Sequence, residues 1–172
     1  FSSDRDGSYD IFLKPADGSG APEKLLDRPG NEFGADWSRD GEHLLWVDVK
    51  DSAGDIWRLR RNPDGAEPEV EPLLTGEADE SSPRFSPDGR YFAYVSNESG
   101  KNEVYVRPFP EGGGRWQVSQ DGGSQPRWRG DGKELFYVSE GAVYAAHVST
   151  QPTFAPGGST LLFEDKDAFG GR

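Results

Sequence analysis

The sequence contains no cysteine, which excludes disulfide bonds and thiolate metal sites without fixing the compartment of the protein. It has only two histidines, His43 and His147, and each lies within a strand pattern. We interpret both as structural or surface residues rather than metal ligands. No stretch approaches the roughly 20 consecutive apolar residues that a membrane-spanning helix needs.

Common signatures of catalysis are also missing. There is no Gly-x-Ser-x-Gly nucleophile elbow, no His-Glu-x-x-His zinc motif, and neither the His-Arg-Asp nor the Asp-Phe-Gly element of a protein kinase. The 31 acidic residues do not exclude a glycosidase-like carboxylate pair, but so many acids place some pair at any separation by chance. The glycine-rich stretch 110–115 joins two short strands, so we interpret it as a loop rather than a phosphate cradle. We expect no catalytic residue, no cofactor and no metal.

The charge balance is strongly acidic, with a formal net charge of -12 from 31 acidic and 19 basic residues. Such a chain repels phosphate backbones, so we expect no nucleic-acid partner. We interpret the excess as a solvated acidic surface in preference to a docking face for a cationic partner. Aromatic residues make up 12% of the chain, which argues against disorder, and 23 glycines with 13 prolines favour short strands joined by turns.

An internal repeat is the main feature of the chain. The segments DWSRDGEHLLWV (36–47), RFSPDGRYFAYV (84–95) and RWRGDGKELFYV (127–138) align without gaps. Their turn aspartates, Asp40, Asp88 and Asp131, recur at spacings of 48 and 43 residues, and a glycine follows each of them. Repeats of this length are typical of propeller blades, which hold four strands each.

The strand that follows each Asp-Gly turn is apolar on both faces, as expected for a strand covered on both sides. We therefore predict an all-β fold, a partial β-propeller of four-stranded antiparallel blades with about three and a half blades in this chain. We expect one domain, 1–172, truncated at both ends, with blade parts 1–30, 34–80, 82–124 and 125–165. Further short strands are expected at 10–14, 55–59, 103–107 and 142–146, and at 24–26, 72–74, 116–118 and 161–163.

The stretch RFSPDGRYFAYVSNESGKNEVYVRPF (84–109) resembles the WD40-like Pro-Asp-Gly repeat of TolB-type β-propellers. The longer stretch 104–139 resembles the propeller tails of bacterial eukaryotic-like Ser/Thr protein kinases, and similar tails occur on some winged-helix regulators. This resemblance implies a non-catalytic, extracytoplasmic module that binds a protein or small ligand and belongs to a larger bacterial signalling protein. Two alternatives stay open: a TolB-like periplasmic component of the cell envelope, and the gating propeller of a prolyl-oligopeptidase-like serine peptidase. In each case flanking sequence is needed to complete the propeller.

In propellers of this type the first strand of each blade lines the central channel, and one residue of each repeat is a candidate for that lining. Asp36, Arg84 and Arg127 each precede the first aromatic residue of their blade. If they point inward, they form a mixed, locally basic channel lining in an otherwise acidic domain. The alternative is that they flank the aromatic residue and pair with acidic neighbours in adjacent blades.

The stretch SDRDGSYD (3–10) carries three aspartates around a glycine, a pattern that calcium loops share. Its glycine is fourth counting from Asp4, whereas the glycine of an EF-hand loop is sixth. The stretch also corresponds to two later loops, which share with it a turn glycine (Gly7, Gly54, Gly100) and an acid before the next strand (Asp10, Asp55, Glu103). We interpret it as an inter-strand turn.

Calcium is therefore expected to leave the melting temperature of the protein unchanged, because a ligand stabilises a fold only when it binds the folded state. Thermal unfolding with calcium chloride and with a chelator measures this. A higher melting temperature in calcium would contradict the interpretation.

Overall fold

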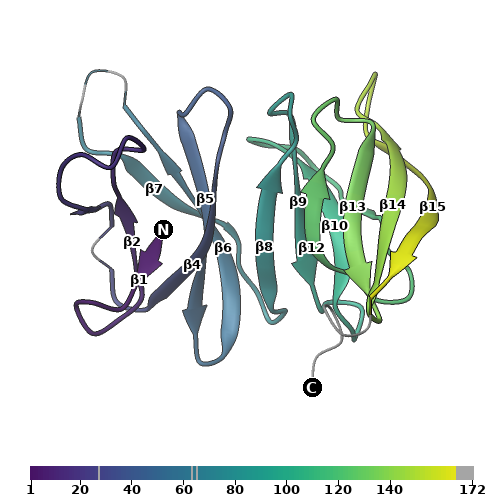
Figure 1. Ribbon diagram of the computed structural model, residues 1–172, viewed down its shortest axis with the longest axis horizontal. Helices are drawn as coiled ribbons and strands as arrows, with labels where there is room; N and C mark the ends of the chain where they lie inside the picture. Colours follow the sequence, from purple (N-terminus) through teal and green to yellow (C-terminus); the bar gives the residue numbers. More distant parts are fainter. Residues whose placement is uncertain (27, 63, 65, 166–172) are drawn as a thin grey trace.

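The chain folds into four antiparallel sheets, shown side by side in the computed structural model (Figure 1). The structure describes residues 1–26, 28–62, 64 and 66–165. Over these residues it contains strands and turns but no helix, and so no helix that could cross a membrane. The first sheet holds β1 (Ser2–Ser3), β2 (Asp10–Leu13) and β3 (Glu23–Lys24).

Each of the other three sheets has four strands in chain order. The second sheet holds β4 (Asn31–Trp37), β5 (His43–Lys50), β6 (Ala53–Arg60) and β7 (Glu69–Leu74). The third holds β8 (Glu80–Phe85), β9 (Tyr91–Ser96), β10 (Glu103–Pro108) and β11 (Trp116–Gln117). The fourth holds β12 (Ser124–Trp128), β13 (Glu134–Ser139), β14 (Ala142–Ser149) and β15 (Ala155–Glu164).

The predicted partial β-propeller is confirmed: three complete four-stranded sheets follow a three-stranded one. The inner strands β4 and β8 begin at residues 31 and 80, a few residues before the blade starts expected at 34 and 82. The predicted extent of a single domain, 1–172, stays a prediction, and its last residues, 166–172, lie outside the described part of the chain.

Apolar residues on both faces of the second strands hold the sheets together. In β5, Leu44 and Trp46 pack with Ile11 of the first sheet, whereas Leu45 packs with Phe92 of the third sheet. Each strand thus contributes to two hydrophobic clusters, one on either side. Burying both faces excludes water between the sheets and stacks them in chain order.

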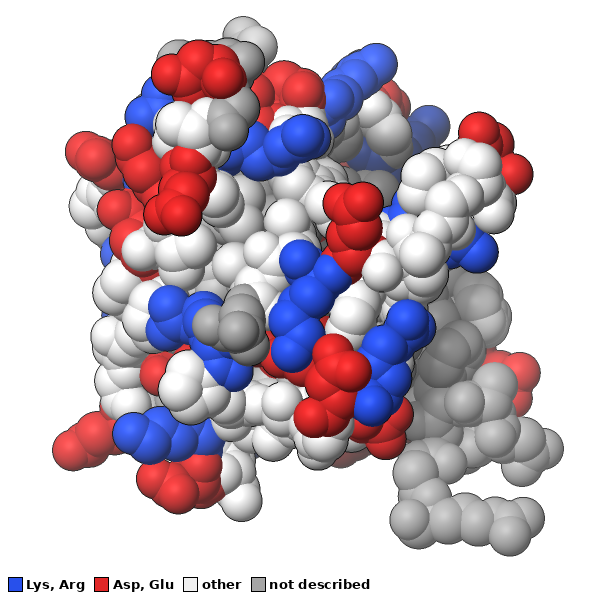
Figure 2. Space-filling view, turned by 90° about the vertical axis from the view of Figure 1, so that its left-hand side faces the viewer, with Lys and Arg blue, Asp and Glu red and all other residues white. Residues whose placement is uncertain are grey.

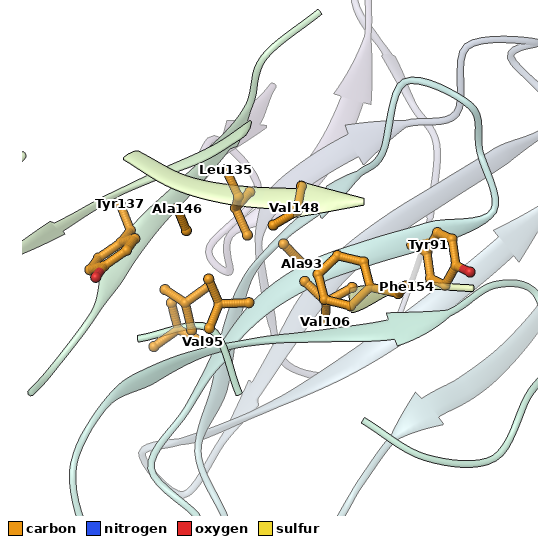
Figure 3. Close-up of a cluster of buried hydrophobic side chains, with 11 residues drawn as sticks. Tyr91, Ala93, Val95, Val106, Leu135, Tyr137, Ala146, Val148 and Phe154 are labelled. Carbon is orange, nitrogen blue, oxygen red and sulfur yellow. The ribbon is translucent and has the colours of Figure 1, made fainter. Parts of the chain in front are cut away.

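The cluster between the third and fourth sheets shows the same alternation (Figure 3). Ala93 and Val95 of β9 turn toward Leu135 and Tyr137 of β13, and Phe154 closes one end of the cluster. All five of these residues are buried. The opposite face of β9, with Phe92 and Tyr94, packs in the cluster toward the second sheet, which is why this strand shows no polar face in the sequence.

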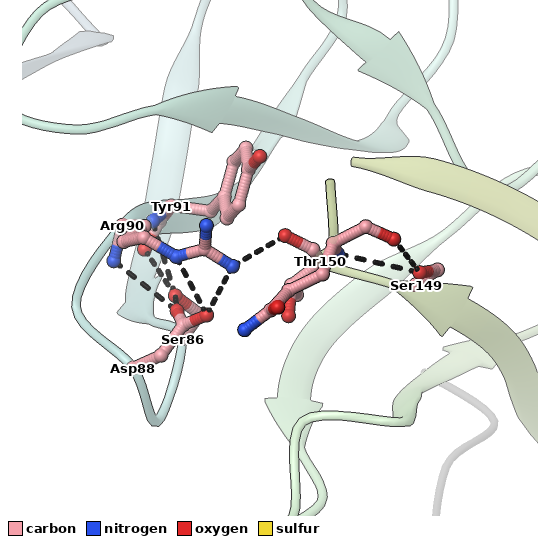
Figure 4. Close-up of polar contacts among 7 residues, drawn as sticks. Ser86, Asp88, Arg90, Tyr91, Ser149 and Thr150 are labelled. Atoms are coloured by element: carbon pink, nitrogen blue, oxygen red, sulfur yellow. Dashed lines mark hydrogen bonds and ion pairs between the residues drawn. The ribbon is translucent and has the colours of Figure 1, made fainter. Parts of the chain in front are cut away.

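The Asp-Gly turn between β8 and β9 is closed by side-chain hydrogen bonds (Figure 4). Ser86 Oγ donates to Asp88 Oδ1 at 2.7 Å and accepts from the Tyr91 N–H at 3.0 Å. Gly89 adopts the left-handed conformation, with φ of 70°, as the turn pattern predicts. Arg90 contacts Asp88 and donates to the Thr150 carbonyl, which ties this turn to the loop after β14.

Gly54 departs from the sequence prediction. It was expected to be a turn glycine, but it lies inside β6, and the left-handed turn residues are Asp51 and Ser52. Gly54 instead allows close approach of the next sheet, because a Cβ atom there would lie 2.5 Å from the Glu80 carbonyl oxygen. The repeat therefore aligns Gly54 with Gly7 and Gly100 in the sequence, but it does not predict what Gly54 does in the fold.

The outer strand of the fourth sheet is uncovered in the described part of the chain. Leu26, Leu74 and Val118, the last residues of the predicted outer strands, are buried beside the following sheet. Phe163 corresponds to them and is 52% exposed, and its neighbours Leu161 and Leu162 are exposed as well.

These positions make a matched test of the packing. Phe92→Ala removes a ring buried between two sheets and is expected to lower the free energy of unfolding by about 3–5 kcal/mol. Phe163→Ala makes the same change on the uncovered strand, and its expected cost is below about 1 kcal/mol. Urea unfolding of both variants measures this. Equal losses would contradict the assigned packing.

Candidate binding face on the inner strands

Asp36, Arg84 and Arg127 occupy corresponding positions on the first strands β4, β8 and β12 of the three complete sheets. Two hydrogen bonds join these strands across the sheet boundaries. Asp36 Oδ2 accepts from the Phe85 N–H at 2.8 Å, and the Trp128 indole Nε1 donates to the Arg84 carbonyl at 3.1 Å. These contacts bring the three charged residues together, and we call β4, β8 and β12 the inner-strand face.

The two guanidinium groups share one local arrangement. Arg84 Nη1 donates to the Pro83 carbonyl at 2.7 Å, and Arg127 Nη1 donates to the Pro126 carbonyl at 2.8 Å. Arg84 also reaches the Gly34 carbonyl of the neighbouring sheet at 3.5 Å. Neither arginine forms an ion pair within the described residues, although the charge of Asp36 in the neighbouring sheet acts on Arg84.

A β-bulge precedes each of the three residues. The pairing register shifts between Phe33 and Asp36, and likewise between the corresponding residues of β8 and β12. In each bulge one residue has a left-handed backbone, namely Gly34 (φ 63°), Ser82 (φ 54°) and Gln125 (φ 52°). A bulge bends its strand and re-aims the side chains beside it. These bulges have no glycine signal in the sequence, because two of the three left-handed residues are serine and glutamine.

Burial and mutual charge set the electrostatics of this face. Burial raises the pKa of Asp36, against the Phe85 hydrogen bond and the charges of Arg84 and Arg127, which lower it. Burial, and next the positive charge of Arg127, lower the pKa of Arg84, while Asp36 raises it. The face therefore holds two cations and one anion, and the arginines repel each other.

The other sequence candidates lie elsewhere. Asp6 and Asp10 both contact the Lys24 ammonium, at 3.5 and 2.9 Å. The Gly7 N–H donates to the Asp4 carbonyl at 3.0 Å, which closes a turn. The described residues contain no group of three or more acidic, histidine or cysteine side chains arranged to hold a metal ion. The edge of the His43 ring meets Phe109, with centroids 5.0 Å apart.

The surface beside the first sheet carries both acidic and basic side chains. Figure 2 views the side of the molecule that carries the first sheet, and there acidic and basic side chains are interspersed among neutral ones. This view is consistent with a solvated surface.

Asp36 provides a test of the link between the inner strands. Asp36→Ala leaves the buried Phe85 N–H without its acceptor and is expected to cost about 1–2 kcal/mol of unfolding free energy. Asp36→Asn keeps an acceptor oxygen and is expected to cost less than half as much. Chemical denaturation of the two variants measures the difference, and equal stabilities would argue against the assigned hydrogen bond.

No protein-family model matches the chain. One curated relative, Uncharacterized protein Atu1656 of Agrobacterium fabrum, is 29% identical over 122 residues. The match covers 70% of this chain and 36% of that protein, so the chain spans about a third of the relative's length.

Two solved structures show the fold. TolB from Acinetobacter baumannii matches with a TM-score of 0.73 and 18% identity, over 95% of this chain and 40% of that one. A puromycin-hydrolyzing peptidase of Mycobacterium tuberculosis matches with a TM-score of 0.64 and 18% identity, over 84% of this chain and 25% of the peptidase. The chain therefore has the fold of a TolB-like β-propeller, as the sequence resemblance implied.

Proposed function

We propose that this chain is a non-catalytic β-propeller module that binds a protein or small ligand through its inner-strand face. The observation that carries the proposal is the pair of arginines, Arg84 and Arg127. Both lack a carboxylate partner among the described residues, although the protein as a whole has a net charge of -12. Arg84 is half-buried and Arg127 is exposed, and the carboxylate beside them, Asp36, leaves an excess of positive charge that favours an anionic ligand.

A carboxylate group of a peptide or small molecule fits this face best. A guanidinium group holds a carboxylate through two parallel hydrogen bonds, and each arginine here uses one terminal nitrogen on a backbone carbonyl, which orients the rest of its fork. Asp36 repels a second negative charge. The face therefore favours a ligand that has a single acidic group and whose other groups are neutral or donate hydrogen bonds. This arrangement selects the ligand by charge and position without any chemical step.

We further propose that the parent is a larger bacterial signalling protein, with a Ser/Thr kinase as the first choice. An extracytoplasmic location belongs to this proposal and rests on the sequence resemblance. Flanking sequence then supplies the sheets that cover Leu161, Leu162 and Phe163. The partial coverage of TolB, 40% of its length, supports the need for further sheets.

Two alternatives have their own support. A TolB-like periplasmic component of the cell envelope is supported by the TM-score of 0.73 to TolB. The gating propeller of a serine peptidase is supported by the likeness to the puromycin-hydrolyzing peptidase. The flanking open reading frame separates the three: an upstream kinase domain with one membrane span, a signal peptide with a small α/β domain, or a downstream domain with Gly-x-Ser-x-Gly.

Titration calorimetry with N-acetylglycine, which carries one carboxylate, tests the binding face at low ionic strength. Arg84→Gln and Arg127→Gln are each expected to weaken binding about tenfold, which corresponds to about 1.4 kcal/mol. Asp36→Asn is expected to strengthen it, because the change removes a repelling charge and keeps the hydrogen-bond acceptor.

Arg60→Gln is the matched control, because Arg60 lies on β6, outside the inner-strand face, where it contacts Glu69 at 3.7 Å. Binding to this variant should equal that of the unmodified protein. Binding that is absent, or that falls equally in all three arginine variants, would contradict the assignment of the face.

A further inference from the structure

Two glutamates are buried where neighbouring sheets meet. Glu32 is the second residue of β4 and is 0% exposed. Glu80 is the first residue of β8 and is 8% exposed. They lie 48 residues apart, the same spacing as the turn aspartates of their two repeats. A buried carboxylate is costly unless it is paired or neutralised, so its recurrence at two sheet boundaries requires an explanation.

At the boundary between the first and second sheets, which we call the first seam, Glu32 faces acids from both sides. Asp10 of β2, 1% exposed, and Asp48 of β5 both act on it with negative charge. Neither carboxylate oxygen of Glu32 accepts a hydrogen bond within the described residues. The cations near it are Lys24, which lies 2.9 Å from Asp10, and Arg28.

At the boundary between the second and third sheets, the second seam, Glu80 has a similar environment. Asp55 of β6 contributes the largest negative charge, followed by Glu98 and Asp79. Ser96 Oγ donates to Glu80 Oε1 at the long distance of 3.5 Å, and Oε2 has no hydrogen-bond partner among the described residues. Glu98 is itself paired with Arg115 at 2.6 Å, so the positive charge beside this seam is already engaged.

The boundary between the third and fourth sheets, the third seam, differs from the other two in how its buried acid is satisfied. Glu103 of β10 corresponds to Asp10 and Asp55 and is also 0% exposed, but it is held by hydrogen-bond donors. Ser119 Oγ donates to one carboxylate oxygen, and the Gly122 N–H donates to the other at 3.0 Å. Lys101 lies 3.4 Å away. The position of Glu32 and Glu80 in the repeat is taken here by Gly123, so no second acid enters this seam.

We propose that Glu32 in the first seam and Glu80 in the second each bind a proton, so that acidification tightens the contact between successive sheets. A buried carboxylate is repelled by ionised acids beside it, and one proton on it removes that repulsion and lets the protonated oxygen donate a hydrogen bond. In the third seam, fixed hydrogen-bond donors already satisfy the Glu103 carboxylate, so no proton is needed there. The chain thus combines two proton-sensitive seams with one that is insensitive.

The electrostatics of the two glutamates support this proposal. Burial, then Asp10 and Asp48, raise the pKa of Glu32 to about 7. Burial, then Asp55 and Glu98, raise the pKa of Glu80 to about 7 as well. The folded protein therefore binds protons that the unfolded chain, with ordinary glutamates near 4.5, has already released. The stabilisation is complete below about pH 4.5 and is lost as the pH rises through about 7.

Urea unfolding of the full 172-residue chain between pH 5 and pH 8 tests the proposal. The midpoint is expected to fall as the pH rises toward 7 and then to level off. Glu32→Gln and Glu80→Gln mimic the protonated forms, so each should remove about half of this fall, and the double variant should remove most of it. A Glu77→Gln variant, which changes an exposed acid, should keep the full fall.

Carbon-detected NMR of the glutamate side-chain carboxyl groups in the unmodified protein gives a second measurement that does not depend on the variants folding. Two carboxyl resonances, assigned to Glu32 and Glu80, are expected to titrate near pH 7. Titration of both below pH 5, or a midpoint that does not fall between pH 5 and pH 7, would overturn the proposal.

Discussion

Every sheet boundary in this protein depends on strands that are apolar on both faces. β5 buries Leu44 toward the first sheet and Leu45 toward the third, and β9 repeats the arrangement with Phe92 toward the second sheet and Ala93 toward the fourth. A sheet that hides both faces has no solvent side, so successive sheets must stack, and the short turns keep them in chain order. The inner strands are thereby brought together, and the buried acids of the seams are enclosed by the same contacts.

The inner-strand face follows from this stacking. The Asp36 carboxylate and the Trp128 indole form hydrogen bonds that cross from one sheet to the next, so the same residues that join the sheets also surround Arg84. The bulges before these residues use left-handed backbone at Ser82 and Gln125, which costs of order 1 kcal/mol at each non-glycine position. Strain that recurs at the same place in successive repeats is consistent with a functional face, because nothing in the strand ladder itself requires it.

The repeat in the sequence was sufficient to predict the fold, since the Asp-Gly turns and apolar strands are local patterns that the structure reproduces. It also placed Asp36, Arg84 and Arg127 at corresponding positions on first strands. The bulges were not predicted because two of their left-handed residues, Ser82 and Gln125, are not glycine. The role of Gly54 and the burial of Glu32 and Glu80 were not predicted for another reason. Each depends on a contact with the neighbouring sheet, such as Gly54 against the Glu80 carbonyl, and the sequence of one repeat carries no sign of what faces it.

The central claim is that the inner-strand face binds an anionic ligand. Mapping of amide chemical shifts by NMR, with N-acetylglycine added in steps, tests it most directly. The largest shifts are expected on Phe85 and on residues around Arg84 and Arg127 in β8 and β12. Shifts confined to the Asp-Gly turns or to β15, with the inner strands unchanged, would contradict it.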